Sequence, residues 1–187
     1  MGPGSELMDC DIFIAGFGGQ GILMLGNLLA YAAMLEGRNV SYFPAYGVEK
    51  RGGAATCTVV ISDEEVGSPV IGRPGTAILL NQISLDKYFD RIRPGGLCIV
   101  NTSLVEMGDR QRDDLDLLPV PVTEIALEVG DNRLVNMVAA GAWAGRTGKV
   151  SLDSIGRALE QVLPARNHRF IPLNMQAMER GAACARS

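Results

Sequence analysis

The sequence is poor in the residues that build metal and iron–sulfur centres. Its 187 residues include four cysteines and one histidine, His168, and no two cysteines have the Cys-x-x-Cys spacing. Zinc and iron–sulfur sites need thiolates and imidazoles in such groups, so a site held by this chain alone is not expected. A cysteine beside an apolar run is typical of a small buried hydrophobe, and disulfides are not expected in a reducing compartment. The cysteines are Cys10, Cys57, Cys98 and Cys184.

The sequence also lacks a concentration of positive charge and a long hydrophobic run. Lys and Arg total 17 against 21 Asp and Glu, which gives a net charge of −4. No segment gathers basic residues, so nucleic acid is discounted as a partner. The longest apolar stretch, from Ile22 to Leu35, is interrupted by Gly26 and Asn27 and is too short to span a bilayer. With no secretory signal ahead of it, the chain is predicted to be cytoplasmic and to have no membrane partner.

The composition that remains is ordinary for a globular domain. Hydrophobic residues make up 47% of the chain and charged residues 20%, and the length suits one well-buried domain. Residues 1–5 resemble the remnant of an expression vector and are left out of the fold prediction. No repeat, low-complexity tract or linker divides the rest, which predicts a single domain over residues 9–187.

Apolar runs bounded by Gly, Pro and small polar residues predict strands, and apolar periodicity near 3.6 residues predicts helices between and after them. This alternation favours an α/β fold, a three-layer α/β/α sandwich that is Rossmann-like with a largely parallel mixed sheet. Pro119 and Pro121 suit an edge for the last strand, and Ser151 is expected to cap a helix. Strands are expected at residues 11–15, 39–46, 54–62, 76–80, 97–100 and 117–122, and helices at 19–36, 84–92, 131–145, 151–163 and 167–183.

A glycine-rich turn follows the first predicted strand and opens the first predicted helix. It reads Gly16-Phe17-Gly18-Gly19-Gln20-Gly21 and fits the Gly-x-Gly-x-x-Gly pattern of nucleotide-binding turns. Glycines here let backbone N–H groups and the helix N-terminus approach a phosphate, whose charge the helix dipole favours. The alternative is that the glycines serve only close packing of the helix on the strand.

The second predicted strand bears on which nucleotide such a turn could hold. A dinucleotide site usually has an acidic residue about 20 residues after the turn that binds the ribose, and this sequence has none at that distance. Arg38 and Ser41 leave an alternative, an NADP-dependent reductase with a 2′-phosphate at these residues. A second alternative is a nucleotide-binding, Rossmann-like regulatory module without catalytic activity.

A charged loop flanked by glycines follows the second predicted strand. Its segment from Tyr46 to Gly53 contains Glu49, Lys50 and Arg51, and it lies at the carboxyl end of a strand, where open α/β sheets keep functional residues. Arg51 could meet a phosphate or carboxylate in forked geometry. The alternative is a solvated hairpin turn.

Together these two segments read Gly-x-Gly-Gly-Gln-Gly at 16–21 and Tyr-x-x-x-Tyr-Gly-x-Glu-x-Arg-Gly-Gly at 42–53. The pair resembles the gamma subunit, or gamma-like domain, of the 2-oxoacid:ferredoxin oxidoreductases, which include pyruvate, 2-oxoglutarate and 2-oxoisovalerate enzymes. The resemblance continues through 59–63, the Ser68-Pro69 step and Asn136-Met137, so that it covers most of residues 9–145.

The resemblance implies a subunit that works inside a larger complex with alpha-, beta- and delta-type sister subunits. That complex cleaves a 2-oxoacid at thiamine diphosphate, transfers two electrons through iron–sulfur clusters to ferredoxin and releases an acyl-CoA. The Gly-Asp-Gly…Asn pattern that binds magnesium and diphosphate is missing here, since residues 108–110 and 130–132 are poor substitutes. The expectation is that sister subunits bind thiamine diphosphate, magnesium and the clusters, and that this chain alone binds none of them.

The resemblance also implies a contact with coenzyme A (CoA) in the gamma-like domain. No catalytic and no metal-binding residue is predicted, and His168 is interpreted as structural. The small and apolar residues late in the chain predict an apolar partner surface, with self-association into a homo-oligomer when the chain is isolated. The predicted cofactor-binding residues are Gly16, Gly18, Gly19, Gln20, Gly21 and Arg51, and the interface or orienting residues are Tyr46, Glu49, Gly52, Gly53 and Asn136.

Overall fold

The computed structural model describes residues 10–46, 54–66 and 71–186. The predicted site residues Glu49, Arg51, Gly52 and Gly53 lie outside the described residues, as does the side chain of Tyr46. Six strands form one mixed sheet in the order β2-β3-β1-β4-β5-β6. The strands are β1 (Cys10–Phe17), β2 (Asn39–Tyr46), β3 (Ala54–Ser62), β4 (Thr76–Leu79), β5 (Leu97–Asn101) and β6 (Asp116–Val120).

The sheet is parallel on one side and antiparallel on the other. Strand β1 pairs with β4 in parallel, and β4 with β5 and β5 with β6 do the same. Strand β3 is antiparallel to both of its neighbours, β1 and β2. The fold class is therefore confirmed as α/β with a mixed sheet, and β6 is an edge strand, as Pro119 and Pro121 predict.

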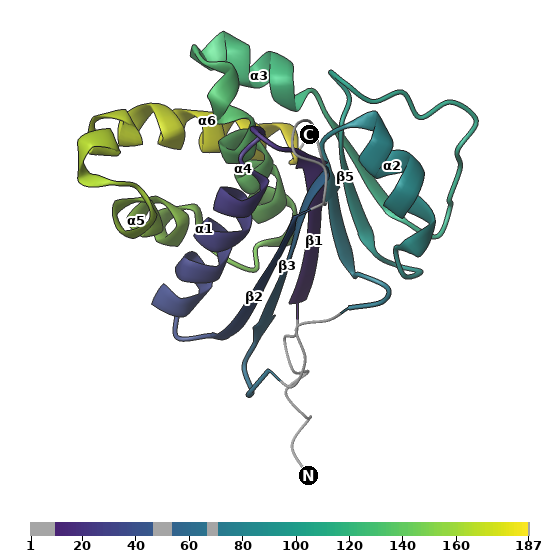
Figure 1. Ribbon diagram of the computed structural model, residues 1–187, viewed down its shortest axis with the longest axis horizontal. Helices are drawn as coiled ribbons and strands as arrows, with labels where there is room; N and C mark the ends of the chain where they lie inside the picture. The colour runs from purple at the N-terminus through teal and green to yellow at the C-terminus, as the bar shows by residue number, and fades with distance from the viewer. Residues whose placement is uncertain (1–9, 47–53, 67–70, 187) are drawn as a thin grey trace.

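Helices lie on both faces of the sheet but in unequal layers (Figure 1). One face is covered by α1, α3, α4 and α5, with α6 packed outside α4, and the other carries α2. Among the described helices, none is long and apolar enough to cross a bilayer. The helices are α1 (Ile22–Leu35), α2 (Gln82–Tyr88), α3 (Val122–Val129), α4 (Val135–Thr147), α5 (Leu152–Val162) and α6 (Ile171–Cys184), with short 3-10 turns η1 (Phe89–Arg91), η2 (Asn132–Leu134) and η3 (Ala165–Phe170).

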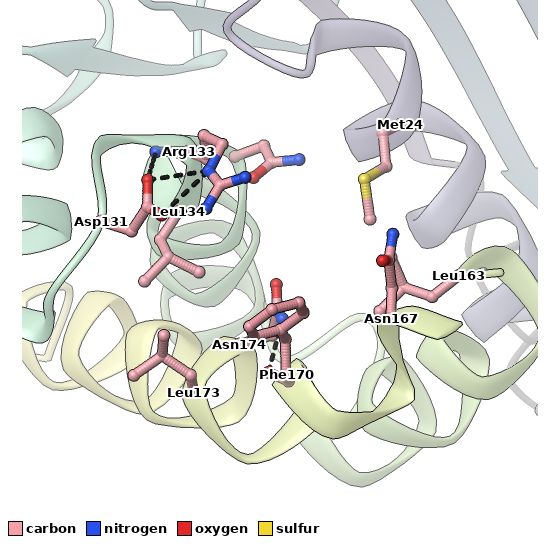
Figure 2. A pocket seen from close by; sticks show the side chains of 10 residues that line it. Met24, Asp131, Arg133, Leu134, Leu163, Asn167, Phe170, Leu173 and Asn174 are labelled. Atoms are coloured by element: carbon pink, nitrogen blue, oxygen red, sulfur yellow. Dashed lines mark hydrogen bonds and ion pairs between the residues drawn. The ribbon is translucent and has the colours of Figure 1, made fainter. Parts of the chain in front are cut away.

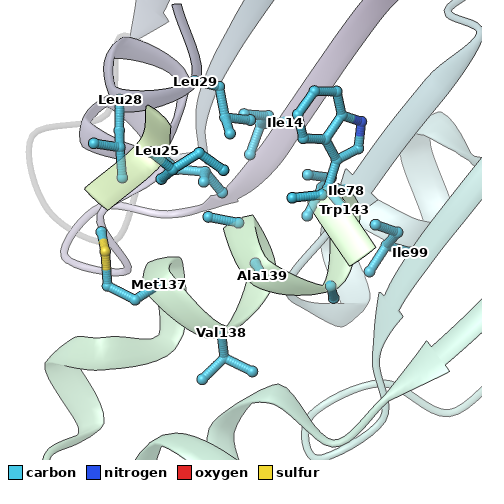
Figure 3. Packing of buried hydrophobic residues seen from close by; sticks show 14 of the residues in the cluster. Ile14, Leu25, Leu28, Leu29, Ile78, Ile99, Met137, Val138, Ala139 and Trp143 are labelled. Carbon is cyan, nitrogen blue, oxygen red and sulfur yellow. The ribbon is translucent and has the colours of Figure 1, made fainter. Parts of the chain in front are cut away.

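The main core lies between the sheet and the larger helical layer. Trp143 of α4 is fully buried among side chains from α1 and from the central strands (Figure 3). Leu25 and Leu29 of α1 and Ile14 of β1 are fully buried in the same cluster. Burying large apolar side chains contributes about 1.5–3 kcal/mol each, so this layer holds α1 firmly on the strand that precedes it. A rigid first strand and first helix fix the glycine turn between them.

Helices α4 and α6 pack with almost no side chain between their backbones. A Cβ atom added at Gly141 would lie 1.9 Å from the carbonyl oxygen of Met178, and one at Gly181 would lie 2.1 Å from that of Val138. The small residues late in the chain therefore serve an internal contact between helices. The prediction that these residues form an exposed partner surface is wrong for this stretch, because α4 is buried from Val135 to Ala144.

The predicted elements agree with the structure except after β6. The bounds of β2 and β3 match their predictions, and Ser151 caps α5 by accepting a hydrogen bond from the backbone N–H of Ser154. Helix α3 is missing from the prediction, which extended a strand to Val122. The helix predicted from residue 131 begins instead as the 3-10 turn η2, capped by the side chain of Asp131.

Candidate functional site

The glycine turn lies at the carboxyl end of β1 and leads directly into α1. Gly18 and Gly19 are exposed, and Gly19 and Gly21 have φ angles of 99° and 73°. These left-handed conformations favour glycine, and Gly21 is the N-cap residue of α1. The backbone of the turn is therefore open to a ligand at Gly18 and Gly19.

Gly16 and Gln20 hold the turn together from inside. A Cβ atom at Gly16 would lie 2.6 Å from Oε1 of Gln20, so a side chain there would displace the carboxamide of Gln20 from its present position. Oε1 of Gln20 accepts a hydrogen bond of 2.7 Å from the backbone N–H of Phe17, and its Nε2 donates to the carbonyl of Leu80 at 3.3 Å. The carboxamide of Gln20 thus ties the turn to the end of β4, and its predicted contact with a cofactor stays a prediction.

The N-terminus of α1 has no side-chain cap, because Gly21 has no side chain that could accept from the first turn. Asn136, in the first turn of α4, lies against it. A Cβ atom at Gly21 would lie 2.4 Å from Nδ2 of Asn136. Asn136 is 3% exposed, and its Oδ1 is buried with no hydrogen-bond partner among the described residues. The structure thus brings the predicted residue Asn136 to the glycine turn and leaves one of its polar atoms unsatisfied.

The described ends of the charged loop lie beside the same turn. Ala54, the first residue of β3, pairs with Phe17, and Ala55 pairs with both Gly16 and Tyr46. The chain therefore leaves β2 and enters β3 next to the end of β1. This placement is compatible with the predicted convergence of Arg51 and the glycine turn, which stays a prediction.

Arg38 and Ser41 lie at the amino end of β2, on the side of the sheet opposite to the strand ends that carry the glycine turn. Ser41 pairs with Val60, which in turn pairs with Asp11 near the start of β1. Nε of Arg38 lies 2.5 Å from a carboxylate oxygen of Asp63. The expectation of a 2′-phosphate site at Arg38 and Ser41 is wrong, because Arg38 precedes β2 and Ser41 is its third residue, whereas the carboxyl end of β2 adjoins the glycine turn.

Two buried asparagines at the carboxyl ends of β4 and β5 were missed from the sequence. Asn81 accepts from the backbone N–H of Ser84 and caps α2, while Asn101 donates to the carbonyl of Leu80 and to Oγ1 of Thr123. Both shape the edge on which the turn lies, and both side chains have protein partners. The available signal was an asparagine directly after an apolar run, at Leu80-Asn81 and Val100-Asn101.

A cavity of about 270 Å³ opens beside Asn136, between α1, the start of α4 and the segment that enters α6. Figure 2 shows Met24, Phe170 and Asn167 around this space, with Arg133 at one side. Asp131 accepts hydrogen bonds from Arg133, which hold the pKa of this carboxyl at about 2. Sequence reasoning did not find the cavity, because its walls come from segments more than 100 residues apart.

Three of the four cysteines are buried, and the histidine contacts a backbone carbonyl. Burial raises the pKa of Cys10 to about 11 and that of Cys57 and Cys98 to about 12, which confirms these thiols as buried hydrophobes. Nε2 of His168 lies 3.0 Å from the carbonyl oxygen of Leu163, a contact that suits a structural role. Over residues 10–46, 54–66 and 71–186, no three His, Cys, Asp or Glu side chains are grouped to hold a metal.

An open α/β sheet with an uncapped glycine turn at its carboxyl edge defines a Rossmann-like domain suited to an anionic ligand. The sequence model for pyruvate ferredoxin/flavodoxin oxidoreductase matches residues 11–184. The chain belongs to this family.

The relatives carry the same domain in two arrangements. The chain is 38% identical over 183 residues to the ketoisovalerate oxidoreductase subunit VorA of Methanothermobacter marburgensis, covering 97% of this chain but 37% of that protein. The keto/oxoacid ferredoxin oxidoreductase gamma subunit of Geobacter sulfurreducens superposes with a TM-score of 0.80 at 29% identity, covering 94% of this chain and 98% of the other.

A third relative is a solved structure from Magnetococcus marinus, described as 2-oxoglutarate:ferredoxin oxidoreductase with 2-oxoglutarate, coenzyme A and succinyl-CoA bound. It superposes with a TM-score of 0.84 at 25% identity and covers 95% of this chain and 31% of that chain. The domain therefore occurs as a separate subunit in one relative and as about a third of a longer chain in others.

Proposed function

We propose that this chain is the gamma component of a 2-oxoacid:ferredoxin oxidoreductase. The complete enzyme converts a 2-oxoacid, CoA and two oxidised ferredoxins into an acyl-CoA, carbon dioxide, two reduced ferredoxins and a proton. In this proposal the chain holds CoA at the glycine turn, and sister alpha-, beta- and delta-type subunits carry the redox groups. Family membership supports the assignment. So does the relative described as a gamma subunit, because the superposition covers 98% of its length.

The two arrangements of the domain support a partner that carries the rest of the enzyme. Where the domain is part of a longer chain, it is covalently linked to further sequence of the same enzyme. A separate subunit must then bind an equivalent polypeptide without a covalent link. Thiamine diphosphate supplies the electron sink for decarboxylation, and the described residues of this chain present no metal-binding group that would hold its magnesium ion.

The observation that carries the CoA assignment is the contact between Gly21 and Asn136. The first turn of α1 presents backbone N–H groups without a side-chain cap, and the amide of Asn136 lies directly beside them. Such groups favour an anion with several acceptor oxygens, as a phosphate has. CoA carries three phosphate groups, whereas the 2-oxoacid and ferredoxin carry none. The relative from Magnetococcus marinus, whose description includes bound CoA, is compatible with this choice.

This chain then contributes binding and orientation to the reaction. Phosphate contacts at Gly18, Gly19 and the start of α1 fix one end of CoA, which leaves its thiol end to reach a sister subunit. Holding a reactant in place makes an encounter between two molecules into a step within one complex. In this proposal no side chain of this chain transfers a proton, and proton transfer takes place on the sister subunits.

Replacing Arg51 by Ala tests the proposal in the assembled enzyme. If Arg51 meets a phosphate of CoA, its loss removes a charged hydrogen bond of about 1.5–3 kcal/mol and raises the KM for CoA by about 10- to 150-fold. The KM for the 2-oxoacid should change little. Arg51→Lys should recover part of the loss, because an ammonium group cannot reproduce the forked contact. Steady-state kinetics with each substrate varied in turn measures both effects.

A matched control is Arg157→Ala, which removes an exposed arginine from α5. It should leave both KM values unchanged. If Arg51→Ala assembles normally and keeps the CoA kinetics of the unaltered enzyme, the assignment of Arg51 to the CoA site is wrong. If the variant fails to assemble, Arg51 belongs to a partner surface, and the glycine turn is then tested through Asn136.

A further inference from the structure

Helix α1 differs from an ordinary surface helix because it carries no charge. Its 14 residues, from Ile22 to Leu35, include no Asp, Glu, Lys or Arg. One side of α1 packs on the sheet, and the opposite side of such a helix usually carries charged residues. A helix that is apolar on all sides is typical of a buried position. The composition of α1 therefore indicates that its outer side is covered in the assembled state.

The outer side of α1 is nevertheless exposed in the single chain. Tyr31 is 40% exposed, Met34 56% and Leu35 40%, and all three lie in the second half of the helix. Their spacing of three and four residues places them on one side. Isolated apolar residues are ordinary on protein surfaces, whereas a contiguous group of them indicates an interaction site.

The first half of the outer side is hollowed. Helix α1 lies between α5 and β2, and an open groove of about 380 Å³ follows this boundary (Figure 1). The hydroxyl of Tyr42 donates to the carbonyl oxygen of Leu23 at 3.0 Å and fixes β2 against α1. None of the described residues that line the groove is charged. They are Leu23, Met24 and Asn27 of α1, Tyr42 and Pro44 of β2, and Val162 of α5.

The outer side of α1 therefore has a hollowed half and a protruding half. A contact in which two copies use the same surface requires a surface that is complementary to itself. When two α1 helices pack antiparallel around a twofold axis between Asn27 and Tyr31, the protruding half of each copy faces the hollowed half of the other. Asn27 then lies opposite Tyr31 of the second copy, and Leu23 lies opposite its Leu35.

The chemistry of the two halves suits this pairing. The carboxamide of Asn27 and the hydroxyl of Tyr31 are neutral groups that can donate to and accept from each other. Because α1 has no charged side chain, the contact removes none of its charges from water. A sister subunit would need a ridge and a hollow of its own at matching places, whereas a second copy of this chain supplies both. These features select a second copy as the partner.

We propose that the outer side of α1 is the contact surface of a homodimer in which two copies pair their α1 helices antiparallel. The inference concerns a surface that the proposed function does not use. A standard interface buries about 800 Å² on each partner, which is more than one helix side provides. The neighbouring residues of β2 and α5 therefore join the contact, and the dimer is expected to dissociate at concentrations on the order of micromolar.

Sedimentation equilibrium of the purified full chain tests the inference. The 19.9 kDa chain should approach twice this mass as its concentration rises from about 1 to about 200 µM. Met34→Lys places an ammonium group in the contact twice per dimer and should raise the Kd at least about 100-fold. Leu127→Lys on α3 is the matched control, because Leu127 is 58% exposed and Met34 is 56% exposed. The control should keep the Kd within about twofold.

Three results of this experiment would overturn the inference. The first is a chain that stays monomeric over the whole concentration range. The second is a dimer whose Kd responds equally to Met34→Lys and Leu127→Lys, or to neither. The third is a monomeric chain whose Met34→Lys variant binds its sister subunits more weakly, because the outer side of α1 then belongs to a sister subunit.

Disulfide trapping tests the antiparallel pairing separately. Chains with Asn27→Cys and chains with Tyr31→Cys, one of them enlarged by a mass tag, are mixed and oxidised with copper phenanthroline. Antiparallel pairing brings position 27 of one copy close to position 31 of the other, so the mixed disulfide should exceed both self-linked products. The unaltered chain, in which three cysteines are buried, is the control for background linkage. Preferred self-linkage of either variant, or no linkage above this background, contradicts the proposed pairing.

Discussion

Asn136 is the residue at which the needs of folding and of binding differ most clearly. Its side chain is 3% exposed, and Oδ1 has no partner among the described residues. A buried polar atom without a partner costs about 1–3 kcal/mol, and an apolar or small residue would avoid this cost. Such unsatisfied groups are rare in native proteins, and a ligand that satisfies the group is one explanation for each of them.

Asn136→Ala should separate these two needs. The variant should unfold at a temperature no lower than that of the unaltered chain, because it removes an unsatisfied oxygen and leaves a small space beside an existing cavity. In the assembled enzyme its KM for CoA should rise about tenfold, since one hydrogen bond to CoA is lost. Thermal unfolding and CoA kinetics on the same preparation check both parts. A lower unfolding temperature with unchanged CoA kinetics would give Asn136 a purely structural role.

For single residues, the sequence predicted the places of some correctly and misplaced others. The position of the glycine turn and the burial of three cysteines followed from local pattern, because a strand, a tight turn and a helix are contiguous in the chain. The role of Gln20 in closing the turn did not follow, since its partner Leu80 is 60 residues away. Arg38 was misplaced because it was chosen by its distance of about 20 residues from the turn, although the predicted strand at 39–46 begins after it.

Among the elements, the contact of α4 with α6 is the most sensitive to added volume. At Gly141 and Gly181 an added Cβ atom would meet backbone carbonyl groups, which cannot turn aside as a flexible side chain can. Helices that approach this closely must move apart to admit a methyl group, and α4 carries Asn136 in its first turn. The site therefore depends on this contact.

Gly141→Ala should lower the free energy of unfolding by at least about 2 kcal/mol, in the upper part of the range for overpacked cores. Gly72→Ala is the matched control, because a Cβ atom at Gly72 meets nothing within 4 Å and its φ angle is not positive. Denaturant unfolding of both variants gives the comparison. Similar stability of the two variants would show that α4 and α6 can move apart at little cost.

Most elements could be predicted because their apolar pattern decides them locally. Strands β2 and β3 alternate between the face covered by α1 and a partly exposed face, and their bounds were predicted to the residue. Helix α3 was missed because it starts directly after Pro121, and its Val122 continues the apolar run of β6. The antiparallel placement of β3 between β2 and β1 depends on long-range pairing, which a local pattern does not encode.

In the whole molecule, the candidate site lies at the carboxyl ends of β1 and its neighbours. The face of the sheet that carries α2 is only partly covered. The smaller helical layer packs on β1, β4 and β5, whereas outward side chains of β2 and β3 stay partly exposed, including Phe43 at 48%. A domain that occurs both as a separate subunit and within longer chains is expected to have such uncovered surface. The proposed reaction therefore belongs to a complex in which this chain is one component.

Reconstitution of the complex tests this account most directly. The sister subunits are purified with and without this chain, and CoA-dependent ferredoxin reduction is followed by absorbance with a 2-oxoacid as the donor. The account predicts that the chain alone is colourless, contains no iron and oxidises no 2-oxoacid, and that adding it to its sister subunits restores ferredoxin reduction with saturable dependence on CoA. Full CoA-dependent activity of the sister subunits without this chain, or iron–sulfur absorption from the chain alone, would contradict the account.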